Sequence, residues 1–146
     1  METVYEAAGG SEGMLRLAHA WHERVMADEL VSHAFHGEVK ADHTERLAAY
    51  WGEALGGPAG YTGTYSSQAE VERLHSGNGE HDEMNRRAIA CFDEALNDAA
   101  LTDPRLRQVL HDYFAWATNS PMYQHTSAAI RDDATVPRWS WDGLEA

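Results

Sequence analysis

The sequence is poor in residues on which several classes of protein depend. Cys91 is its only cysteine, which excludes an internal disulfide and a thiolate metal cluster. Its 11 basic residues face 24 acidic ones, and the resulting net charge of −13 argues against binding to nucleic acid or to an anionic membrane surface. No apolar run approaches the length of a bilayer span, and the N-terminus lacks the basic start and apolar centre of a secretory signal. We therefore expect a cytoplasmic protein without a membrane span.

Common enzyme signatures are also missing. The chain contains no glycine-rich phosphate loop, no paired-carboxylate signature and no recognisable Ser-His-Asp cluster. It does contain 146 residues, of which 43% are hydrophobic, enough for one globular domain with a real core. It also contains nine histidines. Any bound metal would therefore be held by nitrogen or oxygen, with nitrogen favoured.

Helical periodicity dominates the chain, and no convincing alternating strand is found. Apolar residues recur at three- and four-residue spacings, which predicts helices over 12–27, 42–55 and 82–98 and a last long helix from Pro104 that ends at Pro121. Residues 28–37 are expected to form a short helix or turns, residues 59–68 a loop and residues 69–75 a short helix. The prediction is an all-α protein.

Cap and stop residues mark the ends of these helices. Gly9-Gly10 supplies a tight corner after a short first helix, and Ser11 is the predicted N-cap of the helix that follows. Asp42 is expected to cap the next long helix in a capping box with Glu45. Gly56-Gly57-Pro58 stops that helix through chain flexibility and the missing proline N–H.

Two histidines stand on separate predicted helices. His75 closes a short helix and runs into a glycine-rich bend, whereas His43 opens the helix over 42–55, with Phe35 before it. Two such imidazoles could hold a flat iron cofactor from both of its faces. The plain alternative for each is a surface histidine or one whose hydrogen bonds are satisfied in the core.

The order and spacing of these segments resemble the truncated (two-over-two) globins, most closely the second bacterial group. The resemblance covers roughly residues 4–121 and implies a globin-like two-over-two helical sandwich around haem. It divides the chain into a globin domain, 1–121, and a C-terminal extension, 122–146, a tail of uncertain structure. The matching segments are Tyr5-Glu6-Ala7-Ala8-Gly9-Gly10, Leu55-Gly56-Gly57-Pro58 with Tyr61, Arg73-Leu74-His75, and Ala90-Cys91-Phe92-Asp93-Glu94-Ala95-Leu96.

The resemblance implies haem b (iron protoporphyrin IX) with His75 as the proximal ligand of the iron. The alternative is that His75 caps the end of its helix by meeting free carbonyls. Other positions match residues that pack on the ring, line the pocket or meet the propionates, although each could also be a core or surface residue. These predicted cofactor-binding residues are Phe35, His43, Arg46, Leu47, Tyr50, Tyr61, Arg73, Leu74 and Ala88.

The opposite, distal side departs from the family pattern. His43 falls at the usual distal position, where it could donate a hydrogen bond to a ligand or bind the iron itself. His22 stands where a tyrosine is usual, and an imidazole donates or accepts according to its tautomer. Ala88 stands where a tryptophan is usual, which should leave the pocket roomier unless Trp21, Trp51 or the tail fills it.

The expected function is a haem globin that binds diatomic ligands such as oxygen, carbon monoxide or nitric oxide. One use is reversible oxygen binding, and another is a six-coordinate resting state suited to electron transfer or sensing. A third is redox chemistry, nitric oxide dioxygenase or peroxidase-like, with His43 or His22 as catalytic acid and base and a reductase as a candidate partner.

A different class stays open, a haem-free helical protein that binds another protein. The Arg138-Trp139-Ser140-Trp141 segment would suit a contact surface, since aromatic residues and arginine are frequent in interfaces. The same segment could instead fold back as a lid over the core. The oligomeric state is not predicted.

Overall fold

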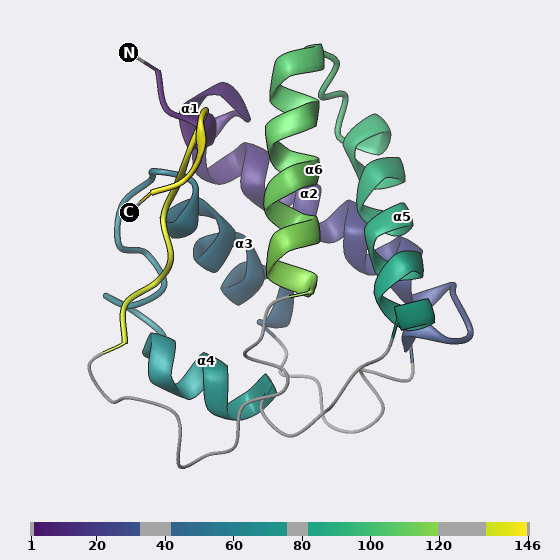
Figure 1. Cartoon of the computed structure of the whole chain (residues 1–146), viewed down its shortest axis with the longest axis horizontal. Coiled ribbons are helices and arrows are strands. Elements are labelled where there is room, and N and C mark those ends of the chain that lie inside the picture. Colours follow the sequence, from purple (N-terminus) through teal and green to yellow (C-terminus); the bar gives the residue numbers. More distant parts are fainter. Residues whose placement is uncertain (1, 33–41, 76–81, 120–133, 146) are drawn as a thin grey trace.

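The computed structural model describes residues 2–32, 42–75, 82–119 and 134–145 (Figure 1). The all-α prediction is confirmed: the helix over 82–98 has the predicted bounds, and the other long helices begin and end within a few residues of prediction. None of the described helices is both long and apolar enough to cross a membrane. The helices are α1 (Val4–Ala7), α2 (Gly10–Met26), α3 (His43–Ala54), α4 (Gln68–His75), α5 (Asp82–Asp98) and α6 (Pro104–Thr118).

Glycines build the corner between α1 and α2. Gly9 and Gly10 have φ angles of 104° and 66°, in the left-handed region that glycine adopts without strain. Because α2 already begins at Gly10, the prediction that Ser11 is its N-cap is wrong. A Cβ on Gly13 would lie 1.8 Å from the carbonyl oxygen of Ala8, so the two backbones touch here. The corner therefore needs glycine for its turn and for its close approach.

The capping box predicted at the start of α3 is also wrong. Asp42 precedes the helix, but its side chain makes no capping hydrogen bond, and its φ of −100° and ψ of 26° are not the extended geometry usual for a cap. The Asp42 carboxylate instead accepts a hydrogen bond from Arg46 Nε at 2.8 Å. The reason is competition, since a guanidinium offers a stronger, charge-assisted bond than a backbone amide.

The long helices pack as two pairs. α2 lies against α3, α5 lies against α6, and α2 also contacts α5, which joins the pairs. Phe92 of α5 stacks on Phe114 of α6 with ring centroids 4.2 Å apart, and Trp51 of α3 meets Phe92 edge-on at 5.5 Å. These three rings are at most 5% exposed, so they form the centre of the core. This is the globin-like two-over-two arrangement that the resemblance predicted.

Residues 134–145 form a C-terminal hairpin that packs on α6 (yellow in Figure 1). Its short strands β1 (Trp139–Ser140) and β2 (Gly143–Leu144) pair antiparallel. The ring of Trp139 lies 5.8 Å from that of Tyr113 and 5.7 Å from that of Trp116, both on α6. The periodicity of the sequence did not reveal these strands, because two residues are too few to show alternation.

The same hairpin ties the two ends of the chain together. Trp141 donates a hydrogen bond from Nε1 to the carbonyl oxygen of Glu2 at 2.8 Å, and the guanidinium of Arg105 lies 4.8 Å from the centre of the Trp141 ring. The described part of the tail thus folds back on the helices, as one of the two alternatives expected. The boundary of the globin domain at residue 121 stays a prediction, since residues 120–133 lie outside the described ranges.

We predict that Trp139→Ala destabilises the protein by about 3–5 kcal/mol, the usual loss when a large aromatic side chain is removed from a core. Because Trp139 is only 8% exposed, most of its surface contacts other residues, and these contacts are lost in the variant. A thermal melt should show a Tm lower by roughly 10 °C. The control is Leu144→Ala on the same hairpin, where a 50% exposed side chain should contribute under about 0.5 kcal/mol. A Trp139→Ala melt that matches the parent would mean that the hairpin is not part of the folded core.

Candidate functional site

The packing of α2 on α3 brings two predicted site histidines side by side. His22 lies on α2 and His43 is the first residue of α3. Their ring centroids are 5.4 Å apart and the ring planes are inclined by 55°. The Nδ1 atom of His22 and the Nε2 atom of His43 are both buried. The two residues predicted for the distal side therefore form one small cluster, which we call the histidine pair.

Burial and charge set the protonation of His43. Desolvation by burial lowers the pKa of its imidazole below the ordinary 6.5, and the neighbouring His22 lowers it further. The carboxylates of Asp42 and Glu45 act in the opposite direction but do not outweigh these effects. His43 is therefore a neutral imidazole at pH 7, with one ring nitrogen that donates and one that accepts.

Trp21 occupies the space beside Ala88. Its Nε1 donates a buried hydrogen bond to the carbonyl oxygen of Ala88 at 3.1 Å. Its ring also meets Trp51 at 5.9 Å and Phe114 at 5.5 Å, both edge-on. Trp21, one of the groups expected to fill the volume left by the small Ala88 side chain, thus contacts the backbone of Ala88. This indole N–H is engaged with the backbone of α5.

Arg46 and Leu47, predicted to contact the cofactor, have protein neighbours along α3. Arg46 pairs with Asp42, and its guanidinium lies 4.8 Å from the centre of the Tyr65 ring. Leu47 follows His43 by one helical turn, is half-buried and packs against the core. Both side chains therefore contact other parts of the protein in the positions from which they would reach a cofactor.

Tyr50 and Tyr61, also predicted at the cofactor, contact each other. Their rings lie edge-on with centroids 5.4 Å apart. The Tyr50 hydroxyl donates to Gln68 Oε1 at 2.7 Å. Tyr61 is 7% exposed, and its burial raises the pKa of its hydroxyl. Both tyrosines therefore belong to a packed junction between α3, the turn after it and the start of α4.

Glu53 and Gln68 are buried polar residues that the sequence did not single out. Each is at most 5% exposed, and each accepts hydrogen bonds at this junction. The available signal was weak: Glu53 is a charged residue between Gly52 and Ala54, close to a predicted helix stop.

Several predicted residues fall beyond what the structure describes. Phe35 lies outside the described residues. Apart from Ala88 on α5, the remaining predicted cofactor-binding residues are on α4. There the backbone is helical to its last residue, but the side chains of three predicted residues lie outside the description: Arg73, Leu74 and His75.

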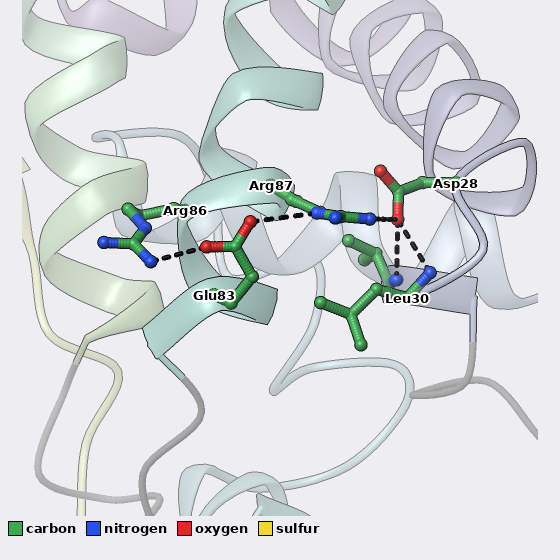
Figure 2. A network of polar contacts seen from close by, with 6 residues as sticks. Asp28, Leu30, Glu83, Arg86 and Arg87 are labelled. Atoms are coloured by element: carbon green, nitrogen blue, oxygen red, sulfur yellow. Dashed lines mark hydrogen bonds and ion pairs between the residues drawn. The ribbon is translucent and has the colours of Figure 1, made fainter.

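A polar network anchors the chain just before the segment that contains Phe35 (Figure 2). The Asp28 carboxylate accepts hydrogen bonds from the amides of Leu30 and Val31, both at 2.9 Å, and pairs with Arg87 at 3.5 Å. Arg87 in turn pairs with Glu83 at 3.1 Å. The amide of Val31 and the other donors hold the pKa of Asp28 below its usual value. The start of the α2–α3 connection is thus tied to the first turn of α5.

The residues present suit a haem. Imidazole is a good donor for iron, and haem iron takes axial ligands from its two faces. The histidine pair supplies buried ring nitrogens between α2 and α3, and α4 ends at a further histidine, His75. Among the residues that can be described, no three His, Cys, Asp or Glu side chains gather to hold a bare metal ion.

Two surface depressions lie away from these residues. The larger, about 440 Å³, opens between α5 and α6, where His111 Nδ1 and Asp93 Oδ1 are 2.7 Å apart. The smaller, about 170 Å³, lies between α6 and the C-terminal hairpin. Neither is lined by a predicted site residue, so we do not assign the cofactor to either.

Comparison with known proteins agrees with the geometry. The family model of the bacterial-like globins matches residues 3–119. The group 1 truncated haemoglobin of Synechocystis is 32% identical over 83 residues, which cover 56% of this chain and 67% of that protein. This relative and two further group 1 truncated haemoglobins are covered over 53% to 67% of their length, so about two thirds or less of each is compared.

Solved structures share the fold along most of the chain. A thermostable haemoglobin from the actinobacterium Thermobifida fusca is 26% identical with a TM-score of 0.67, and the match covers 91% of this chain and 100% of that one. The group II truncated haemoglobin of Bacillus anthracis has a TM-score of 0.72 at 17% identity, covering 86% and 93%, which shows the common fold alone. The truncated-globin resemblance is thereby confirmed. The chain belongs to the bacterial-like globin family, and that membership implies haem as its cofactor.

Proposed function

We propose that this chain binds haem b through His75 and takes diatomic gases at the iron, with the histidine pair on the opposite side. The observation that carries the proposal is the pair itself, two imidazoles 5.4 Å apart with buried ring nitrogens. The remaining predicted contacts, from Phe35 to Ala88, stay part of the proposal. So does the cytoplasmic location.

The residues of the chain divide the work between them. Haem supplies a ferrous iron able to bind oxygen, carbon monoxide or nitric oxide. His43, neutral because burial lowers its pKa, can donate one ring N–H to a gas ligand in the pocket while its other nitrogen accepts. His22, with its ring tilted against that of His43, can fix the tautomer and orientation of His43 or take its place as donor.

A second candidate is redox chemistry, oxidation of nitric oxide or reaction with peroxide. The observation that favours it is again the neutral His43, since a neutral imidazole can accept a proton from peroxide and return it to the departing oxygen. A neighbouring imidazole could share that proton. Sustained turnover would then require a reductase as a partner.

We predict that His75→Ala sharply weakens haem retention, whereas His43→Ala keeps haem and alters ligand kinetics or the ferric spectrum. The loss of an axial nitrogen removes a bond to iron, but loss of a distal residue removes only an interaction with the ligand. The measurement is a series of ferric, ferrous and carbon monoxide spectra of the parent, His75→Ala, His43→Ala and His22→Ala proteins.

The same series separates the alternatives. A parent that is colourless after reconstitution with haem would favour the haem-free interaction module. Full haem occupancy with an unaltered spectrum in His75→Ala would remove the proximal assignment. The variant whose ferric spectrum changes identifies which member of the histidine pair acts on the ligand side.

We also predict that burial of neutral His43 makes stability depend on pH on the acid side. Its pKa is lowered in the folded protein from an ordinary 6.5, so the unfolded chain binds the proton more readily. The stability that this group permits is present above about pH 6.5 and is lost as the pH falls below it. Thermal melts at about pH 5.5 and about pH 7.5 should differ less in His43→Gln than in the parent.

The matched control for this test is His19→Gln, since His19 is an exposed histidine on α2. It should leave the difference between the two melts at its parental size. An equal difference in the parent and in His43→Gln would show that His43 is not held neutral by the fold.

A further inference from the structure

One face of α3 holds the turn that leads to α4. Arg46, Tyr50 and Glu53 are spaced by four and three residues, which places them along one side of the helix. Each contacts the stretch between α3 and α4 or the start of α4 itself. We call this stretch, residues 55–67, the α3–α4 turn.

Glu53 makes the most specific of these contacts. Its carboxylate oxygen Oε1 accepts hydrogen bonds from the amides of Tyr61 at 3.1 Å and Thr62 at 2.9 Å. The other oxygen, Oε2, accepts one from the Thr62 hydroxyl at 2.7 Å. Both oxygens are thus used, and the residue is only 5% exposed. The carboxylate acts as a template for the middle of the turn.

Stability alone does not account for a buried carboxylate such as that of Glu53. Removing such a group from water is unfavourable, and its hydrogen bonds only partly offset that, so a well-packed apolar side chain often stabilises a protein as well or better. What the carboxylate adds is direction, because three donors must meet two fixed oxygens. The contribution of Glu53 is therefore mainly to the shape of the turn.

The end of the turn is fixed by the same face of α3. Tyr50 donates to Oε1 of Gln68, the first residue of α4, at 2.7 Å, and Gln68 is only 4% exposed. The Tyr50 ring also packs edge-on against Tyr61 at 5.4 Å. Tyr61, whose amide is held by Glu53, therefore also packs against Tyr50, the residue that holds the start of α4.

Two further residues of α4 are buried. Ala69 and Val71 are buried, yet within the part of the chain that can be described they are not members of the central hydrophobic cluster. In Figure 1, α4 lies at the edge of the molecule below α3. The turn and its contacts with α3 are a restraint on where α4 lies.

We propose that Glu53 is a positioning residue for the haem site. Through Tyr61 and Thr62 it fixes the α3–α4 turn, and the turn places α4, which ends at His75, relative to α3, which begins at His43. The inference rests on the proposed role of His75 as the iron ligand. Glu53 itself touches neither iron nor gas ligand in this mechanism.

Two substitutions at Glu53 separate the loss of its hydrogen-bond acceptors from a change in the size of its side chain. Glu53→Gln keeps an oxygen that can accept both amides, whereas Glu53→Met keeps the length of the side chain and removes both acceptors. Thr62→Val, at an exposed residue, removes only the bond to Oε2 and serves if the Met variant does not fold. The control is Leu96→Ala on α5, which lowers core packing at a buried side chain outside the hydrogen bonds of Glu53 and Thr62.

The first readout is amide hydrogen exchange in the haem-free protein. In Glu53→Met we expect the amides of Tyr61 and Thr62 to exchange at least about tenfold faster than in the parent, because a buried acceptor is lost. Glu53→Gln should stay within about threefold of the parent. Leu96→Ala should not single out these two amides.

The second readout is the iron–histidine stretching band of the ferrous haem protein. We expect this band to shift or broaden in Glu53→Met and, to a smaller extent, in Thr62→Val, but not in Glu53→Gln or Leu96→Ala. Fast exchange in Glu53→Met with an unchanged band would overturn the positioning role, as would unchanged exchange. A parent without haem would instead overturn the proposed function, and exchange would still decide whether Glu53 fixes the turn.

Discussion

The buried indole of Trp21 holds together the helices on which the site depends. Its Nε1 donates to the carbonyl oxygen of Ala88 on α5, and its ring meets Trp51 of α3 and Phe114 of α6. A buried indole N–H needs an acceptor, and here the acceptor is a backbone atom, which fixes the position of α2 along α5. Because His22 follows directly in the sequence, the same bond decides where that imidazole meets α3.

The same bond lies at Ala88, where the resemblance to truncated globins leads us to expect a tryptophan. The backbone carbonyl of Ala88 accepts the indole N–H of Trp21 from the neighbouring helix. The indole then fills volume as part of the core, with its N–H already engaged. The donors that the proposed function gives to a ligand are the two imidazoles, and burial lowers the pKa of one of these, His43.

The long helices, and the placement of His22 and His43 on them, could be predicted because they depend on local patterns. The 3.6-residue period, Pro104 at a helix start and Gly56-Gly57-Pro58 at a stop act within a few residues of the chain. Asp42 shows where local rules fail. A capping aspartate and an ion-pairing aspartate look alike in sequence, and here the carboxylate pairs with Arg46 instead of capping the helix. Glu53 could not be predicted, since its partners are backbone amides eight and nine residues away that only the folded turn brings back.

Helix α3 connects the two sides of the proposed haem site. His43 is its first residue and Glu53 lies ten residues later, which at 1.5 Å per residue is a rigid separation of about 15 Å. One end of the helix carries an imidazole of the histidine pair, and the other end holds the turn that places α4. A shift of α3 would therefore move the ligand side and the iron-holding side together. The distance between the two sides is set by a single helix and the turn attached to it, so changes in the core beneath α3 should affect both sides at once, whereas changes confined to the α3–α4 turn should affect only α4.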